Sequence, residues 1–348
     1  MTQVVRKLKE SGEVNIGIIG CGGVVESYHL PVLASIPDLK IAWVCDSSVD
    51  RARSVARNWG VGEAFGKIED CSDVDAVLVA TPVGTRREIL DKTAARGWHT
   101  FCEKPFAAST KEHLDMIECA ARNGVKFGAG YVRRYLWAVE KARDIVRSKV
   151  LGPLKQVVAS EYMHLQRTGV DMSSYRNSVK ASGGGILLET GCHLLDEVLF
   201  MTDAQAVDVR ACSQKTWNDY EVDTVAAAQI TLASGDQVAL QLEVSGIRPL
   251  FSGVAFRGEL GELRLHLDRA KGLEVFLGKG LQCRLEVPTP RPGEPDVVLA
   301  FRKEWLYFLE AIRTAGKWDP NWETGLMTTD FIMRCGELAK ASCVGVQG

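Results

Sequence analysis

The segment GGGILLETGCHLLDEVLF carries several ionisable residues among its leucines, and three of them have helical spacing. They are Glu189, His193 and Asp196, and their spacing of four and then three residues places them on one face of a predicted helix. Burying an ionisable group without a partner is costly, so the three either satisfy one another or act on a ligand. A histidine can exchange a proton near neutral pH, and a carboxylate can orient it. A metal site is chemically possible, but no HExxH pattern or second ligand cluster supports it, so we predict no metal.

Two further groups of candidates follow apolar stretches earlier in the chain. Thr81 and Pro82 come after DAVLVA, and Glu103, Lys104 and Pro105 come after HTFC. Open α/β sheets bind their ligands at the carboxyl ends of strands. A Glu-Lys pair on a surface is usually solvated charge, but its position after an apolar strand makes Lys104 a candidate for the active site.

A glycine-rich turn joins the first predicted strand to a helix in the segment NIGIIGCGGVVESYH. Gly20, Gly22 and Gly23, followed by Val24, let backbone N–H groups approach a pyrophosphate at the positive end of a helix. Asp46 ends the second predicted strand, near the spacing of about 20 residues expected for the acid that binds the ribose. The sequence therefore predicts a dinucleotide site.

The acid at position 46 favours NAD over NADP. A carboxylate accepts hydrogen bonds from a free 2′-hydroxyl and repels a 2′-phosphate. Arg51 lies close behind and can turn toward a phosphate, so NADP stays possible. The third position of the glycine fingerprint is Val25, which predicts a looser contact between helix and strand.

Composition excludes several classes of protein. A formal net charge of −2 offers no electrostatic footprint for nucleic acid. The first fourteen residues lack the apolar core of a signal peptide, and no run approaches the roughly 18 apolar residues of a membrane span. Ten cysteines without a CxxC pair are typical of reduced thiols, so we expect a cytoplasmic protein that binds neither nucleic acid nor membrane.

The elements that must position these residues fall into two groups. Residues 1–131 alternate short β-branched runs with helical stretches, which predicts a doubly wound parallel sheet, the Rossmann domain. Residues 132–348 read mainly as consecutive strands, which predicts an α+β domain with a large, mostly antiparallel open sheet. We expect the second domain to bind substrate and to form oligomers, and its C-terminal helix can pack back on the first.

Basic and aromatic residues flank the predicted active-site helix. A solvated loop is the common explanation for such scattered charge, but a surplus of bases would also suit a carboxylate or phosphate on the substrate. The candidates are Arg133, Arg134, Tyr135, His164, Arg167, Tyr175, Arg176 and Lys180.

The sequence resembles the family of glucose-fructose oxidoreductase, inositol dehydrogenase and MocA. The resemblance rests on GIIGCGGVVESYH, DAVLVATP, EKP, and GGG followed by ETGCHLLD, and it extends to the C-terminal EWLYFLEAI and WETGLMTTDFIM segments. It implies a nicotinamide-dependent oxidoreductase with a Rossmann domain and an α/β domain whose open sheet often mediates dimer or tetramer contacts.

The family pattern carries two catalytic residues onto this chain, Lys104 and His193. Members that oxidise polyols or sugars usually have an aspartate four residues before the histidine, where this chain has Glu189. Arg86 is a second departure, because TP-x-x-x-H is common in the family. These differences put the substrate in doubt more than the reaction.

We therefore expect an NAD(P)-dependent oxidoreductase that transfers a hydride to or from a secondary alcohol or ketone of a sugar, cyclitol or sugar derivative. In this hypothesis His193 takes the hydroxyl proton, Lys104 polarises the oxygen and Glu189 orients the substrate or the histidine. Arg134, Tyr135, Arg176 and Asp196 are predicted to contact substrate, although Asp196 fits a structural cluster equally well. Two alternatives remain: an NAD-dependent glycosidase that oxidises its sugar transiently, and a non-catalytic ligand sensor on the same fold.

Overall fold

Two compact units make up the chain, and each is described by itself. The computed structural model describes residues 12–164, 174–204, 207–216, 220–245, 251–268, 272–278, 280–287, 295–314 and 322–344. One unit comprises Met1–Val132 and Val297–Gly325, and the other comprises Arg133–Asp296 and Leu326–Gly348. The C-terminal part of the chain is thus shared between the units and does not belong wholly to the second.

The first unit contains a six-stranded, all-parallel sheet in the order β3-β2-β1-β4-β5-β6. Its strands are β1 (Val14–Ile19), β2 (Leu39–Cys45), β3 (Glu63–Phe65), β4 (Ala76–Val79), β5 (His99–Glu103) and β6 (Phe127–Gly130). This is the strand order of the Rossmann fold, so the predicted class is confirmed. The sequence predicts five of these strands, in VNIGIIG, LKIAWVC, DAVLVAT, WHTFC and VKFGAG; the three-residue β3 is too short to stand out by hydrophobic pattern.

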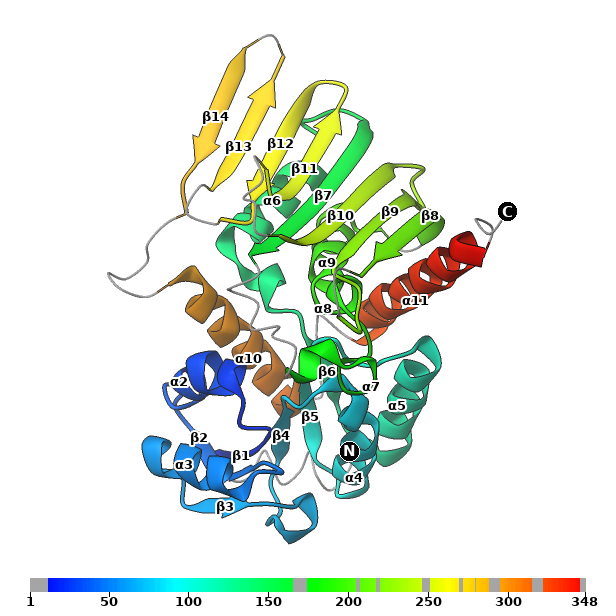
Figure 1. Cartoon of the computed structure of the whole chain (residues 1–348). Coiled ribbons are helices and arrows are strands. Elements are labelled where there is room, and N and C mark those ends of the chain that lie inside the picture. The colour runs from blue at the N-terminus through cyan, green and yellow to red at the C-terminus, as the bar shows by residue number, and fades with distance from the viewer. Residues whose placement is uncertain are drawn as a thin grey trace. The chain divides into compact units, whose positions relative to one another are not determined.

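Helices cover both faces of this sheet (Figure 1). They are η1 (Val25–His29), α2 (Leu30–Leu33), α3 (Val49–Trp59), η2 (Ile68–Asp70), η3 (Val83–Thr85), α4 (Arg86–Ala95), α5 (Thr110–Asn123) and α10 (Asp296–Thr314). The bounds of α5 follow from local chemistry: the Ser109 hydroxyl accepts the Glu112 N–H at 3.1 Å, and Gly124 ends the helix at φ 65°.

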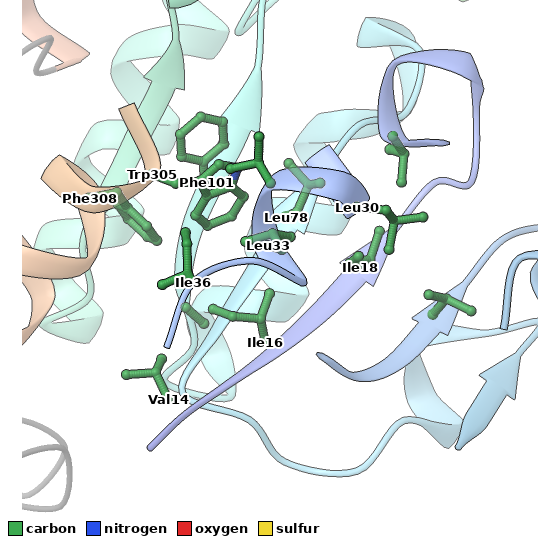
Figure 2. Packing of buried hydrophobic residues seen from close by; sticks show 14 of the residues in the cluster. Val14, Ile16, Ile18, Leu30, Leu33, Ile36, Leu78, Phe101, Trp305 and Phe308 are labelled. Atoms are coloured by element: carbon green, nitrogen blue, oxygen red, sulfur yellow. The ribbon is translucent and has the colours of Figure 1, made fainter. Parts of the chain in front are cut away.

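One buried cluster joins β1, α2 and α10 (Figure 2). Alternate residues of β1 point into it with Leu30 and Leu33, and α10 closes it with Trp305 and Phe308. The rings of Phe101 and Trp305 stack at 4.5 Å between centroids. Burial of such large side chains is the main stabilising contribution to this unit.

The second unit contains an eight-stranded sheet in the order β14-β13-β12-β11-β7-β10-β9-β8. Its strands are β7 (Leu154–His164), β8 (Val207–Lys215), β9 (Val225–Leu232), β10 (Gln237–Ser245), β11 (Gly253–Gly258), β12 (Gly261–His266), β13 (Leu273–Leu277) and β14 (Leu281–Leu285). All neighbours pair antiparallel except β7 and β10. The mostly antiparallel sheet is confirmed. The sequence predicts seven strands, the last of them in GLEVFLG, and β14 is an eighth.

The two faces of this sheet differ in composition. Alternate residues of β9, such as Ala228 and Ile230, are buried, whereas Ala227 and Gln229 on the other face are partly or fully exposed. Helical elements of this unit are η4 (Val132–Tyr135, beginning in the first unit), α6 (Trp137–Arg147), η5 (Tyr175–Asn177), α7 (Val179–Ser182), α8 (Ile186–Glu189), α9 (Gly191–Thr202) and α11 (Trp322–Val344). Within the described residues, no helix combines the length and apolarity needed to cross a membrane.

Candidate active site

The glycine turn after β1 is shaped by close contacts at one position and open space at the next two. Gly20 has φ +96°, and a Cβ there would lie 2.7 Å from the Ala80 carbonyl oxygen. A Cβ at Gly22 or Gly23 would meet no atom within 4 Å. The Gly22 carbonyl accepts the first helical N–H bonds, which leaves the N–H groups of the first turn directed out of the helix end. The turn therefore has the room and the donors that a pyrophosphate needs.

Asp46, directly after β2, is bonded to this turn. Its carboxylate accepts the N–H of Cys21 at 2.8 Å and the N–H of Ser48 at 2.9 Å. Arg51 lies 3.7 Å from it, with a side chain that is 57% exposed. An ionised carboxylate has about four lone-pair sites, so Asp46 keeps acceptor capacity for ribose hydroxyls. These residues fit a dinucleotide.

The remaining candidates of the first unit lie on the same edge of the sheet. Thr81 and Pro82 follow β4, Glu103 ends β5 and Lys104 comes next. Because β2, β1, β4 and β5 are neighbours in a parallel sheet, their carboxyl ends lie in a row. The structure thus gathers all the predicted dinucleotide-binding positions and Lys104 at one edge.

A buried hydrogen-bond chain that sequence reasoning missed supports Glu103. The Trp305 indole N–H donates to Nδ1 of His29 at 2.9 Å, and Nε2 of His29 lies 2.9 Å from Oε1 of Glu103. An indole nitrogen can only donate, so Nδ1 is the acceptor and the proton on Nε2 is donated to Glu103. The other oxygen of Glu103 accepts the main-chain N–H of Lys104 at 3.1 Å.

The carboxyl group of Glu103 is held in its ionised form. Burial by itself would raise the pKa of Glu103, but the hydrogen bond from His29 and the nearby charges of Lys104 and Arg86 lower it below its ordinary value. The sequence contained one signal for this chain: His29 and Trp305 belong to the segments GIIGCGGVVESYH and EWLYFLEAI, on which the family resemblance rests.

The predicted continuous helix over the Glu-His-Asp segment is wrong. The structure has two helices, α8 and α9, interrupted at Thr190, which has φ −108°. Gly191 approaches β10 so closely that a Cβ would lie 2.9 Å from Cδ1 of Leu242, and the freed Glu189 carbonyl accepts the Cys192 thiol at 3.3 Å. Close packing on the sheet therefore prevails over helical periodicity, and the spacing argument for a shared face fails.

Asp223 anchors the start of α8, and sequence reasoning missed it as well. Its carboxylate accepts the N–H groups of Gly185 and Leu187 at 2.9 and 3.0 Å, and its carbonyl accepts that of Ile186 at 2.9 Å. A Cβ at Gly185 would lie 2.1 Å from that carbonyl oxygen, which explains the last glycine of GGG. Burial raises the pKa of Asp223, partly offset by these N–H bonds.

Glu189 pairs with Arg176 beside a cavity of about 250 Å³. Nε of Arg176 lies 2.5 Å from Oε1 of Glu189, and the two side chains are 36% and 30% exposed. The cavity lies against the ends of β7, β9 and β10, and its polar lining includes Thr190, Tyr220 and Asp223. Its size and mixed lining suit a small polar ligand.

Arg134 and Asp196 satisfy each other. Nε of Arg134 donates to Oδ2 of Asp196 at 2.7 Å, a second bond joins the same groups, and the side chains are 2% and 1% exposed. Tyr135 is buried as well. Asp196 is thus bonded to Arg134 and Glu189 to Arg176, and the Arg134–Asp196 pair holds α9 to the segment before α6. Direct contact of these residues with substrate stays a prediction.

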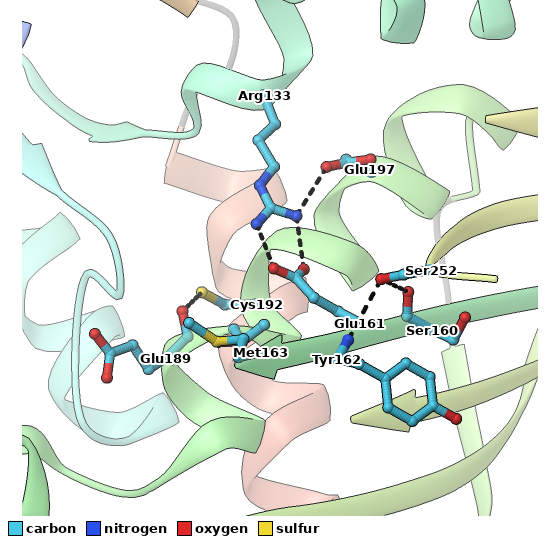
Figure 3. A network of polar contacts seen from close by, with 10 residues as sticks. Arg133, Ser160, Glu161, Tyr162, Met163, Glu189, Cys192, Glu197 and Ser252 are labelled. Carbon is cyan, nitrogen blue, oxygen red and sulfur yellow. Dashed lines mark hydrogen bonds and ion pairs between the residues drawn. The ribbon is translucent and has the colours of Figure 1, made fainter. Parts of the chain in front are cut away.

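Arg133 is matched by two acids (Figure 3). Its guanidinium forms two bonds to Glu161, at 2.8 and 2.9 Å, and a third to Glu197 at 3.3 Å. Burial alone would lower the pKa of Arg133, but the two carboxylates outweigh it and raise the pKa. The arginines at 133, 134 and 176 thus add no surplus positive charge to the described part of this region.

The other candidates are placed as follows. His193 is half-buried in the first turn of α9, Tyr175 is 47% exposed, and Lys180 is exposed. Arg167 and the side chain of His164 lie outside the described residues. In the parts of the chain that the structure describes, no three His, Cys, Asp or Glu side chains are grouped to hold a metal ion.

The strand order of the first unit, its glycine turn and the acid that follows β2 are those of a dinucleotide-binding protein. Two family models match the chain: the oxidoreductase family with an NAD-binding Rossmann fold, over residues 14–131, and the GFO/IDH/MocA C-terminal domain, over residues 139–264. The chain belongs to the GFO/IDH/MocA family of oxidoreductases, which confirms the resemblance seen in its motifs.

Individual relatives agree with this assignment. The rhizopine catabolism protein MocA of Rhizobium meliloti is 29% identical over 203 residues, 58% of this chain and 61% of the relative. The glucose-6-phosphate 3-dehydrogenase of Bacillus subtilis is 30% identical over 215 residues, 60% of each chain. The chain thus spans about three fifths of the length of these curated relatives. The structure of an aldose-aldose oxidoreductase from Caulobacter crescentus, complexed with glycerol, has the same fold (TM-score 0.81, 21% identity, covering 95% of this chain and 98% of that one).

Proposed function

We propose that the protein is an NAD(P)-dependent oxidoreductase acting on a secondary alcohol or ketone of a sugar, a cyclitol or a sugar derivative. The observation that carries the proposal is the row of candidate groups at the carboxyl ends of β2, β1, β4 and β5, where Asp46, the glycine turn and Lys104 follow neighbouring strands. By their names, one of the two relatives takes part in rhizopine catabolism and the other is a dehydrogenase of glucose 6-phosphate.

The residues of this chain divide the proton chemistry between them. Bound nicotinamide supplies the acceptor or donor of the hydride. His193 takes the proton of the substrate hydroxyl, Lys104 donates a hydrogen bond to the same oxygen, and Glu189 orients the substrate or the histidine. Lys104 and His193 belong to different units. The support for their roles is therefore the family motifs and the chemistry of the side chains, and not a distance between the two.

NAD is the preferred cofactor in this proposal. Asp46 presents a carboxylate where the ribose hydroxyls bind, and a negative charge there repels a 2′-phosphate. Arg51 lies close to Asp46 and is mostly exposed, so NADP remains the second choice. Fluorescence titration with NADH and NADPH tests the preference: tighter binding of NADPH would contradict it.

The substrate is uncharged in the part that the second unit binds. Arg176 is neutralised by Glu189, and Arg133 and Arg134 are paired with other acids. The guanidinium groups of Arg133 and Arg134 are each bound to a carboxylate by two bonds, and the charge of Arg176 is offset by Glu189. A polyol or neutral sugar therefore fits better than the anionic substrate that the basic residues suggested.

One experiment tests the activity and the substrate class together. The protein is incubated with NAD or NADP and a panel of cyclitols, neutral sugars, sugar phosphates and nucleotide sugars, and nicotinamide absorbance is followed for wild type and Lys104→Met. Reduced cofactor with wild type alone, on neutral compounds, is the expected result. Cofactor binding without any turnover on the panel would contradict the dehydrogenase and favour a glycosidase with transient oxidation, or a sensor.

A homodimer or homotetramer forms through the partly exposed face of the second sheet in this proposal. Short side chains, Ala227 on β9 and Ala239 on β10, lie on that face beside Gln229 and Gln241. Around Ala239 these short or uncharged side chains suit contact with a second sheet. Light scattering on wild type and Ala239→Arg tests it; a monomeric wild type would contradict the proposal.

A further inference from the structure

Arg86, the first residue of α4, connects the ends of two neighbouring strands. It is 4% exposed, and Nε donates to the Thr81 carbonyl at 2.8 Å. Nη1 donates to the carbonyls of Glu103 and Pro105. One guanidinium therefore binds the main chain after β4 and the main chain on both sides of Lys104.

We propose that Arg86 is the positioning residue of Lys104, fixing the backbone from which the lysine side chain extends. This inference rests on the proposed function, in which Lys104 acts on the substrate oxygen. It gives a role to the residue that replaces the histidine common in the family.

The main-chain N–H of Lys104 is fixed by a different set of residues. The N–H of Lys104 donates to Glu103, whose carboxylate is held by His29 and through it by Trp305. Arg86 holds the carbonyl before Lys104 and the carbonyl after it. With its amide and both flanking carbonyls bonded, the backbone at Lys104 has little freedom to turn.

The geometry of a guanidinium suits this task better than that of other side chains. Its N–H groups point in fixed directions within one plane, so several carbonyls can be bound at once and held relative to one another. A lysine at position 86 would keep the charge but lose the rigid fork, and a glutamine would lose both. The chemical step is sensitive to such placement, because a shift of about 1 Å in a catalytic group can cost about 100-fold in rate.

The neighbouring Arg87 provides a matched control. It is 33% exposed and binds Asp91 and Asp115 through side chains alone, at 2.9 and 3.3 Å. Arg87→Gln removes the same charge one residue away without touching the main chain at Lys104. It should leave turnover and the reactivity of Lys104 unchanged.

The test compares Arg86→Gln and Arg86→Lys with wild type and Arg87→Gln in the full-length protein. We expect kcat to fall about 10- to 100-fold in Arg86→Gln, while KM and the dissociation constant for NADH change little and the variant, although less stable, stays folded at the assay temperature. Arg86→Lys should be intermediate. A folded Arg86→Gln variant with wild-type kcat would overturn the proposal, as would losses in kcat and NADH binding that run in parallel.

A second readout does not depend on turnover. Lys104 and Lys111 are acetylated with limiting N-hydroxysuccinimide acetate, and their labelling rates are measured by peptide mass spectrometry. Lys111, which is 84% exposed, serves as the internal reference. The Arg86 variants should change the rate at Lys104 relative to Lys111, and an unchanged ratio in a folded variant would overturn the proposal.

The two readouts separate this inference from the proposed function. If wild type turns over no compound, the proposed function fails, and the labelling ratio alone decides whether Arg86 positions Lys104. If Arg86→Gln does not fold, Arg86→Lys decides. If neither folds, Arg86 serves the stability of the whole unit and the proposal is overturned.

Discussion

The loop at Lys104 and the segment at Glu189 are built in opposite ways. The lysine loop is held by buried groups: Glu103 is 6% exposed, Arg86 4% and His29 0%. Glu189 sits at a helix break, and its partner Arg176 is 36% exposed. We infer that the chemical step, which all substrates share, depends on the rigid loop at Lys104. The choice among substrates depends on the more adaptable segment at Glu189.

The two regions should also differ in how much free energy of unfolding is lost when one partner of a pair is removed. Removing one partner of a buried, hydrogen-bonded charge costs about 3 to 5 kcal/mol, because the other charge is left unpaired. An ion pair open to water contributes about 1 kcal/mol or less. Substitutions at the lysine loop should therefore threaten both folding and chemistry, and substitutions at Glu189 should mainly change recognition.

The largest expected effect is on turnover. Lys104→Met should lower kcat by about 10² to 10⁴ on every substrate, since in the proposed function it removes the group that polarises the reacting oxygen. Glu189→Gln should change kcat/KM by different factors for different substrates, by about 10-fold or more where a hydrogen bond is lost. Steady-state kinetics on the substrate panel check this. Equal losses on all substrates for both variants would remove the distinction between the regions.

The next effect concerns the free energy of unfolding. His29→Phe should cost about 3 to 5 kcal/mol, because a phenyl ring fits among Phe101, Phe301 and Trp305 but leaves the Glu103 carboxylate and the indole N–H without their partner. Arg176→Met should cost about 1 kcal/mol or less. Urea denaturation followed by circular dichroism gives both values. A cost for Arg176→Met as large as that for His29→Phe would show that the Glu189 segment is also rigidly held.

Two adjacent glycines test how firmly α8 is anchored. A Cβ at Gly185 meets the main chain of Asp223, whereas the nearest atom to a Cβ at Gly184 is Cβ of Leu188 at 3.2 Å. Gly185→Ala should therefore lower the free energy of unfolding by about 2 to 4 kcal/mol, and Gly184→Ala by less than about 1 kcal/mol. The same denaturation experiment checks both. Similar stability of the two variants would mean that α8 can shift away from Asp223.

The sequence predicted the lysine loop better than the Glu189 segment, and the reason is physical. Glycine turns, an acid after a strand and a lysine after a strand are local patterns, and a parallel sheet brings its strand ends together whatever the helices do. The missed strand β3 has only three residues, so a hydrophobic period hardly develops in it.

The Glu189 segment depends on partners far away in the sequence. Asp223 anchors Gly185 across 38 residues, and Arg134 binds Asp196 across 62. No spacing rule indicates such contacts. Leu242 on β10 packs close to Gly191, directly after the break at Thr190, so the helical pattern of the leucines was real but could not reveal where the helix is interrupted. Arg86 was visible only as a departure from the family pattern, because its partners are main-chain carbonyls.

The smallest effect is a pair of opposite pH dependences. The pKa of Glu103 is lowered in the folded protein, so its contribution to stability is complete above about pH 4.5, its ordinary value, and is lost as the pH falls through the lowered pKa. The pKa of Asp223 is raised, so its contribution is present below about pH 3.8 and is lost as the pH rises through the raised pKa.

Glu103→Gln and Asp223→Asn should show these signs directly in urea denaturation between about pH 6 and about pH 3, with the change for Glu103→Gln falling below about pH 4.5. The stability deficit of Glu103→Gln relative to wild type should shrink as the solution is acidified, because wild type loses the ionised carboxylate that the variant never had. The deficit of Asp223→Asn should grow, because wild type gains a protonated acid in a site that disfavours charge. Parallel slopes for the two variants would mean that the acid supporting Lys104 and the acid anchoring α8 lie in electrostatically similar surroundings, and the contrast between the two regions would then rest on exposure alone.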